Sequence, residues 1–229
     1  MNPYAILTGD LIASRKLSSM QITDTLDAMK DFWQKFASLH PGQVLGGLEV
    51  FRGDGWQVAL SSPEHCLDAA IFLRAVVKAC PQSQKSDTRI GIGIGSVDQL
   101  VEGNLGESRG EAFVASGHAL ESLSDSKRRW ALLPDSALHH PVSQMLLPAL
   151  DLAVTRWSAP EAFAVLGEMM GWTQEKTAKH PWAQKKDGTS PSPQAVSDAL
   201  FRIHWKSHLV HILEETRLIL NPSLTSYKA

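Results

Sequence analysis

The sequence predicts an α+β fold in which a sheet domain precedes a small all-α domain. Three patterns indicate this. Short apolar runs alternate with amphipathic helical segments up to about residue 135, and one of these runs, at 88–95, alternates isoleucine with glycine. From about residue 160 onward, the apolar residues recur at helical spacing. We therefore predict a sheet domain at 1–135, a connecting segment at 136–159 and a helical domain at 160–229.

The first two elements are a strand and a long helix. Tyr4–Thr8 is a short apolar run that ends at Gly9-Asp10, which is typical of a buried strand. After Ser18-Ser19, apolar residues recur every three or four positions as far as Leu39, and Pro41-Gly42 follows. The serine cap, the helical spacing and the terminating proline predict an amphipathic helix.

A hairpin and a second helix come next. Leu48–Arg52 and Trp56–Leu60 flank a glycine-bounded turn at 53–55, which predicts a β-hairpin. Ser62-Pro63 supplies a cap and a proline at the first helical position, and the helix is predicted to end before Pro81.

The sheet domain closes with a strand, a helix and a further strand. Thr88–Gly95 has a bulky isoleucine face and a bare glycine face, so either a helix or a ligand can approach it closely. A helix is predicted at 111–123 and a strand at Trp130–Leu133. The first six elements have the order βαββαβ of the ferredoxin-like plan.

Three helical segments make up the C-terminal part. They are predicted at Pro160–Met170, at Gln174–Lys179 and from Ser192-Pro193 onward. The third carries one apolar stripe, formed by Val196, Leu200, Ile203, His204 and Leu209. A tight connection between the first two helices indicates a helix-turn-helix or winged-helix unit.

The composition is that of a globular protein. The 229 residues carry a formal net charge of −2 and are 43% hydrophobic and 20% charged, which excludes a disordered chain. No apolar stretch approaches the ~20 residues that a membrane-spanning helix needs, and residues 1–4 do not resemble a secretory signal. Two cysteines, Cys66 and Cys80, cannot build a disulfide framework. We expect a cytoplasmic protein without membrane contact.

Two aspartates are the candidate metal ligands of the sequence. Asp10 follows the first strand and Asp54 lies at the hairpin tip. In a βαββαβ sheet the first strand is central and lies beside the hairpin, so the two carboxylates can meet. Carboxylates suit Mg²⁺, and the preceding glycines, Gly9 and Gly53, let a triphosphate approach the main chain. The alternative is structural, because Gly-Asp-Gly is a common turn sequence and a strand-ending aspartate often caps a loop.

The loop after Asp10 offers groups that could hold a polyphosphate. Backbone N–H groups of this loop, the Ser14 hydroxyl and the cations Arg15 and Lys16 stand just before the first helix. A phosphate held there through a metal could serve phosphoryl chemistry or nucleotide sensing.

The same segments resemble the SatD family of small bacterial proteins and, more distantly, the catalytic domain of class III nucleotidyl cyclases. The resemblance lies in Thr8-Gly9-Asp10, Ser14-Arg15, residues 53–57 and Arg89–Gly95. It implies a cyclase-type domain with two metal ions, Mg²⁺ or Mn²⁺, held by Asp10, Asp54 and the backbone carbonyl of Leu11. It also implies a nucleoside triphosphate ligand and a homodimer.

The sequence departs from cyclases on the third helix. Cyclases carry a transition-state Asn and Arg there, whereas this chain has Val114–His118. The accessory candidates in their place are Arg109 and His118. Loss of one such donor can cost about 10²–10³ in rate, so the resemblance implies nucleotide and metal binding more directly than turnover.

The C-terminal helices resemble the helix starts of bacterial helix-turn-helix regulators. Residues 170–208 contain six basic and three acidic residues. The residues expected to face DNA are Gln194, Ser197, Arg202 and Lys206, with a phosphate contact from Lys185 and Lys186. Because 180–191 form a long loop, the unit could instead serve interaction or dimerisation.

Three functions therefore remain open. The first is a regulatory protein that binds a nucleotide and metal through its sheet domain and DNA or a protein through its helices. The second is an active nucleotidyl cyclase or nucleotidyltransferase that uses two Mg²⁺ ions. The third is a structural or interaction protein that catalyses nothing.

Overall fold

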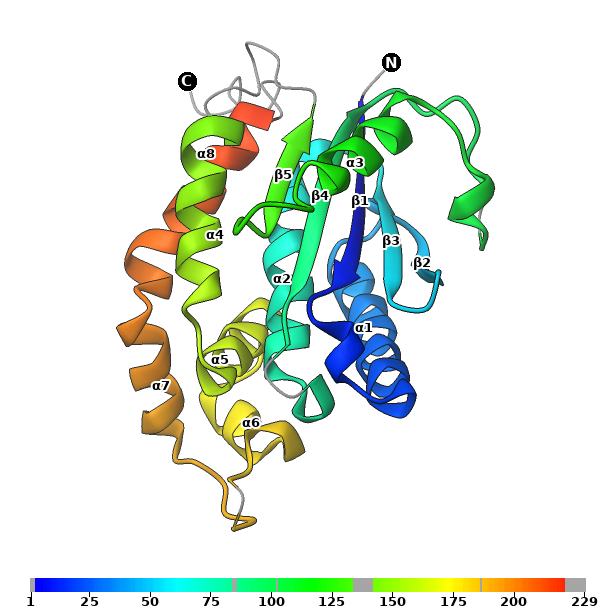
Figure 1. The fold of residues 1–229 in the computed structure, drawn as a ribbon. Coiled ribbons are helices and arrows are strands. Elements are labelled where there is room, and N and C mark those ends of the chain that lie inside the picture. Colours follow the sequence, from blue (N-terminus) through cyan, green and yellow to red (C-terminus); the bar gives the residue numbers. More distant parts are fainter. Residues whose placement is uncertain (1–2, 84–85, 102, 134–141, 186, 221–229) are drawn as a thin grey trace.

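A five-stranded sheet forms the centre of the molecule in the computed structural model, which describes residues 3–83, 86–101, 103–133, 142–185 and 187–220. The strands are β1 Tyr4–Leu11, β2 Val44–Phe51, β3 Gly55–Leu60, β4 Thr88–Gly95 and β5 Trp130–Leu133. Their order is β2-β3-β1-β4-β5, and only the β4–β5 pair is parallel (Figure 1). The first strand is therefore central and pairs with the hairpin, as predicted.

Eight α-helices surround this sheet in the described part of the chain. They are α1 Ser19–Leu39, α2 Cys66–Ala79, α3 Glu111–Glu121, α4 Leu147–Thr155, α5 Ala159–Met169, α6 Gln174–Lys179, α7 Pro193–Arg202 and α8 Val210–Leu220. The start of α1 is fixed by a capping box, because the Ser18 hydroxyl accepts from the Gln21 N–H and the Gln21 side chain accepts from the Ser18 N–H.

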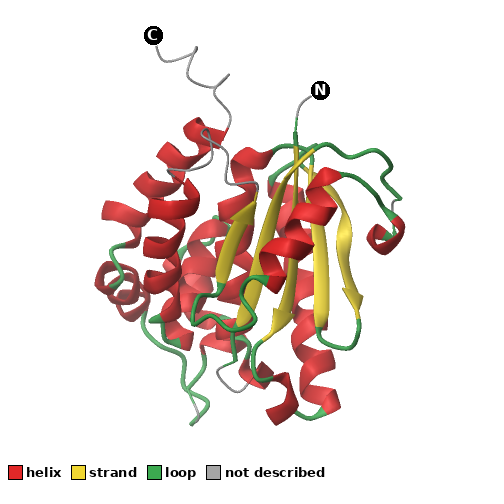
Figure 2. Cartoon of the chain, turned by 45° about the horizontal axis from the view of Figure 1, so that its top comes forward, coloured by secondary structure: helices red, strands yellow, loops and turns green. Residues whose placement is uncertain are grey.

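The two faces of the sheet are covered differently, as Figure 2 shows. Ala5 and Leu7 of β1 join the main hydrophobic core with α1 and α2, whereas Ile6 joins a small cluster with Ala112 of α3. Thr8 shares the face of Ile6, since successive side chains alternate, and its hydroxyl bonds Ser116 of α3 at 2.8 Å. Asp10, two residues after Thr8, lies on the same face at the end of β1.

Helix α3 occupies the bare glycine face of β4. A Cβ on Gly93 would lie 2.1 Å from the Ala112 carbonyl oxygen, and one on Gly91 would lie 2.3 Å from the Ser116 carbonyl oxygen. Only glycine allows this separation. Of the two occupants that the isoleucine–glycine alternation left open, the structure shows a helix.

The C-terminal helices share one hydrophobic core with the sheet. Every residue of α2 except Lys78 is buried, because the sheet covers one side of α2 and α5 packs against another. Leu166, Leu200 and Leu213 belong to the same core cluster as β1. Helix α4 lies within the segment predicted to be a connection, where it buries Leu147 and Leu150.

The predicted single stripe on the last helix is wrong. Helix α7 ends at Arg202, and His204 has a left-handed backbone with φ 56°. A π-helical turn at Trp205–Leu209 then leads into α8. The turn at His204 redirects the chain, so Val196 and Leu209 are buried on different helical segments rather than on one face. The helix-turn-helix prediction, which rested on three helices with a tight first connection, is not confirmed.

Helix α8 is tied to α2 by a partly buried ion pair. The Asp68 carboxylate is 4% exposed and accepts from the Arg217 Nε at 3.0 Å, and His65 Nδ1 lies 3.4 Å away. Burial alone would raise the pKa of Asp68, but the neighbouring His65 and the hydrogen-bonded Arg217 outweigh it and lower the pKa below its usual value.

We expect Arg217→Gln to lose about 1.5–3 kcal/mol of unfolding free energy at pH 7. Because the folded-state pKa of Asp68 is lowered, its contribution is present above the unfolded pKa and is lost as the pH falls through the folded pKa. Urea unfolding at pH 7 and pH 3 should therefore show the difference between wild type and variant shrinking in acid. Lys206→Gln, which removes an exposed pair with Glu168, is the control and should change stability little at either pH. An Arg217→Gln deficit of the same size at pH 7 and at pH 3 would contradict the assignment.

Candidate functional site

A pocket of about 1130 Å³ opens at the end of β1, between the β2–β3 turn and the loop that enters α1. Most of the residues predicted for nucleotide and metal binding line it. They are Asp10, Leu11, Ser14, Arg15, Lys16, Gly53 and Asp54. The structure thus brings two segments that are about forty residues apart in sequence to one cavity.

Backbone hydrogen bonds hold the two aspartate segments together. The Leu11 N–H donates to the Asp54 carbonyl at 3.3 Å, and the Ile12 N–H donates to the Asp87 carbonyl at 2.7 Å. The Thr88 hydroxyl donates to the Asp10 carbonyl at 2.7 Å. The ends of β1, the hairpin turn and the start of β4 therefore form one rigid wall of the pocket.

Positive charge predominates in the lining. Five cationic side chains line the pocket against two carboxylates; the cations are Arg15, Lys16, Arg52, Arg89 and Arg129. The hydroxyls of Ser14, Ser124 and Ser126 add neutral donors, and the first turn of α1 reaches the cavity through Ser19. A helix N-terminus and clustered cations both favour an anionic ligand.

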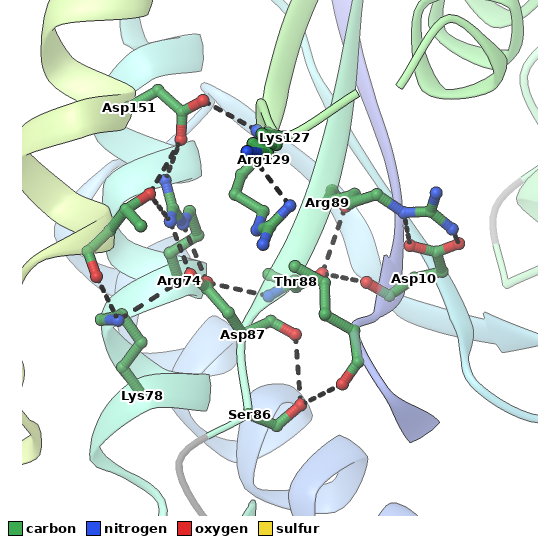
Figure 3. Close-up of polar contacts among 12 residues, drawn as sticks. Asp10, Arg74, Lys78, Ser86, Asp87, Thr88, Arg89, Lys127, Arg129 and Asp151 are labelled. Atoms are coloured by element: carbon green, nitrogen blue, oxygen red, sulfur yellow. Dashed lines mark hydrogen bonds and ion pairs between the residues drawn. The ribbon is translucent and has the colours of Figure 1, made fainter. Parts of the chain in front are cut away.

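Arg89 is paired with one of the two aspartates. Its Nε donates to Asp10 Oδ1 at 2.9 Å, and its second guanidinium nitrogen donates to Oδ2 (Figure 3). The hydrogen bond to Asp10 raises the pKa of Arg89, and the Asp54 carboxylate contributes in the same direction. Sequence reasoning placed Arg89 in a strand motif and missed this role, because the pairing depends on the β1–β4 register that sets Arg89 opposite Asp10.

The donor set fits a divalent cation that is shared with a phosphate ligand. Mg²⁺ commonly takes one or two carboxylates and completes its shell with water and phosphate oxygens. Each oxygen of Asp10 can accept from Arg89 and still keep a second lone pair. Among the described residues no group of three or more His, Cys, Asp or Glu side chains is arranged to hold an ion. The residues therefore do not form a closed metal site made of protein alone.

Arg129 is a further cation that the sequence did not reveal. Its Nε is buried and has no hydrogen-bond partner among the described residues, although Nη1 donates to the Lys127 carbonyl at 3.1 Å. An unpartnered buried donor on a pocket wall is costly unless a ligand or water satisfies it. Arg129 precedes β5 in a polar loop, and no sequence pattern distinguished it from the neighbouring Arg128.

A buried network behind the pocket wall fixes its position. Arg74 of α2 is fully buried and donates to Asp87 at 2.9 and 2.6 Å and to Asp151 of α4 at 2.7 Å (Figure 3). Asp151 also accepts from the Arg129 N–H at 2.7 Å. The network thus connects α2 and α4 to the residue whose carbonyl holds Ile12 at the pocket.

Three predicted site residues do not lie at the pocket. Gly9 is buried under the Trp56 ring, where a Cβ would meet the ring at 2.3 Å, so it packs against an aromatic side chain rather than admitting a triphosphate. Arg109 pairs through its backbone with Gln99, in the loop that follows β4. His118 lines a separate surface depression with Leu133. The structure does not bring either accessory candidate to the aspartates.

The residues expected to face DNA are partly occupied by protein contacts. Arg202 pairs with Glu161 at 3.2 Å and Lys206 with Glu168 at 3.1 Å, and the Gln194 amide donates to Asp198 at 2.8 Å. Lys185 is exposed, Ser197 is half-buried, and Lys186 lies outside the described residues. The acidic residues of α5 thus neutralise part of the predicted basic surface.

In the described part of the chain, no helix has the length and apolar character that crossing a membrane requires.

Comparisons with known proteins give distant likenesses. No protein-family model and no curated protein sequence matches the chain. Among solved structures, a bacterial light-regulated adenylyl cyclase is 16% identical with a TM-score of 0.40, over 57% of this chain and 75% of that one. A second structure of such a cyclase gives 16% and 0.41, over 57% of this chain and 43% of that one. The guanylyl cyclase Cya2 gives 17% and 0.38, over 53% and 70%. These likenesses are too distant to decide an activity for this chain.

Proposed function

We propose that this protein binds a nucleoside triphosphate together with Mg²⁺ or Mn²⁺ in the pocket at the end of β1. The observation that carries the proposal is the lining itself, in which five cations and two carboxylates share one cavity. Cations neutralise phosphate oxygens, and carboxylates supply the hard oxygen ligands of a divalent ion. A metal-bound polyphosphate fits this lining, because its phosphates can pair with the cations and its metal ion with the carboxylates.

Each part of the pocket has a role in this proposal. Asp54 and Asp10, with the Leu11 carbonyl, would hold the cation, whose chemistry is to bridge and neutralise phosphate oxygens. Arg15 and Lys16 with the loop around Ser14 hold the phosphates, and Arg129 adds a further positive charge to the lining. Leu17 and Ile22 are half-buried at the same cavity and provide an apolar surface for the base.

The proposal describes a regulatory nucleotide-binding protein with a ferredoxin-like, cyclase-type sheet domain, which acts as a homodimer. The helices of residues 159–220 share a core with α2, which carries Arg74, so a change at the pocket wall can reach them through α2. Their partner is DNA or another protein. Catalysis as a nucleotidyl cyclase is separable by experiment, because only an enzyme converts the bound nucleotide.

Thermal unfolding tests the binding. We expect ATP or GTP with Mg²⁺ or Mn²⁺ to raise the melting temperature, because a ligand at 100 times its Kd stabilises by about 2.7 kcal/mol. The shift should shrink in EDTA and in Arg15→Gln, while Lys30→Gln, an exposed lysine of α1 outside the pocket, should behave as wild type. The absence of any shift with all four nucleoside triphosphates would refute the proposal. Chromatography of the incubated nucleotides shows whether a product forms.

A further inference from the structure

The Arg89–Asp10 pair lines the pocket of the proposed cation site. The two residues are opposite each other in the β1–β4 register, so the strands hold their backbones at a fixed separation. Their side chains are 27% and 24% exposed, which leaves both open to the pocket that they line. Two guanidinium nitrogens and both carboxylate oxygens are used in the pair.

While Arg89 and Asp10 are paired with each other, a ligand cannot use both groups fully. A cation at Asp10 and Asp54 places positive charge beside the Arg89 guanidinium, which weakens the attraction between Arg89 and Asp10. A phosphate in the pocket offers the same guanidinium two oxygens, which can accept two parallel hydrogen bonds as the carboxylate does. Arginine is therefore able to change from one anion to the other without leaving the pocket.

We propose that Arg89 exchanges partners on ligand binding, from Asp10 in the free protein to phosphate oxygens when a divalent cation occupies Asp10 and Asp54. The inference rests on the proposed function. Without an anion, the released guanidinium would lie unpaired beside the bound cation, so the pocket discriminates against the free metal ion. Cation and polyphosphate consequently bind with positive coupling, and each raises the affinity of the other by the same factor.

Calorimetric titrations with Mn²⁺ alone, with inorganic triphosphate in EDTA and with the preformed Mn²⁺–triphosphate complex test this exchange. In wild type we expect the complex to bind about 5- to 150-fold more tightly than triphosphate alone. In Arg89→Gln we expect Mn²⁺ alone to bind at least about fivefold more tightly than in wild type, because Asp10 is free, and the coupling to shrink. Arg89→Lys keeps the charge but cannot make the two-nitrogen pair, so its affinity for Mn²⁺ alone should lie between those of wild type and Arg89→Gln.

Arg15→Gln is the matched control. It removes one positive charge from the same pocket, but the side chain of Arg15 makes no hydrogen bond or ion pair with the described residues. It should weaken triphosphate binding and change the affinity for Mn²⁺ alone less than Arg89→Gln does. If Arg89→Gln and Arg15→Gln bind Mn²⁺ equally while wild type binds the complex, the exchange is refuted and the proposed function stands. If wild type binds no ligand, both are refuted.

Discussion

Arg74→Met is expected to lower the free energy of unfolding by about 3–5 kcal/mol, the cost of breaking a buried ion pair by removing one partner. Arg74 has no exposed surface, and its guanidinium bonds Asp87, Asp151 and the Thr155 hydroxyl while stacking on the Trp130 ring at 4.9 Å. Methionine keeps much of the volume but leaves two carboxylates without this cation. Urea unfolding followed by circular dichroism measures the loss.

The control for this substitution is Arg202→Met, which removes an exposed arginine from its pair with Glu161. Exposed pairs contribute about 0–1 kcal/mol, so this variant should remain close to wild type. A loss below about 1 kcal/mol for Arg74→Met would mean that the network does not hold the pocket wall.

The second large effect is expected at the carboxylates. Asp54→Asn and Asp10→Asn preserve size and shape but remove the negative charge that a divalent cation requires. We expect each to weaken binding of the Mn²⁺–nucleotide complex at least about 10- to 100-fold, the range seen when even an outer partner of a metal site is lost. Binding of triphosphate in EDTA should not weaken, because the pocket then carries more net positive charge.

Asp27→Asn is the matched control, since Asp27 is an exposed residue of α1 that pairs with Lys30 and does not line the pocket. Its Mn²⁺–nucleotide affinity should equal that of wild type. Titration calorimetry of the three variants gives the comparison. Unchanged Mn²⁺–nucleotide affinity in both pocket variants would mean that the pocket binds the anion but that these carboxylates do not hold a metal ion.

Much of the sheet was predictable because it depends on local patterns. The order of strands and helices set the central position of the first strand, and the isoleucine–glycine alternation of β4 indicated a bare face for close approach, which α3 occupies. The same order brought Asp10 and Asp54 to one pocket. These predictions needed only periodicity, turn residues and topology rules.

The contacts that complete the pocket were not predictable, because they depend on side-chain partners far apart in sequence. Arg89 is 79 residues from Asp10, and Arg74 is 77 residues from Asp151. Nothing in the local sequence around an arginine shows whether it will be buried or paired. The prediction that Gly9 admits a triphosphate was wrong for the same reason, since the ring that covers it comes from Trp56 on the neighbouring strand.

The C-terminal half departed from prediction where local signals were ambiguous. Helix α4 lies in the predicted connecting segment and carries a proline in its first turn, a position that is compatible with a helix. A left-handed residue is usually a glycine, but here it is His204, so the sequence did not indicate the end of α7. The apolar residues on both sides therefore had the pattern of one helix.

The proposed function depends on Asp10 and Asp54 jointly holding a divalent cation in the pocket. An anomalous difference map from crystals grown with Mn²⁺ and a nucleoside triphosphate tests it most directly. We expect one or two peaks within about 2.0–2.4 Å of oxygens of both carboxylates, with the phosphates bound to the same ion and Arg89 turned toward them. Phosphates bound without an anomalous peak, or a peak that neither carboxylate touches, would contradict it.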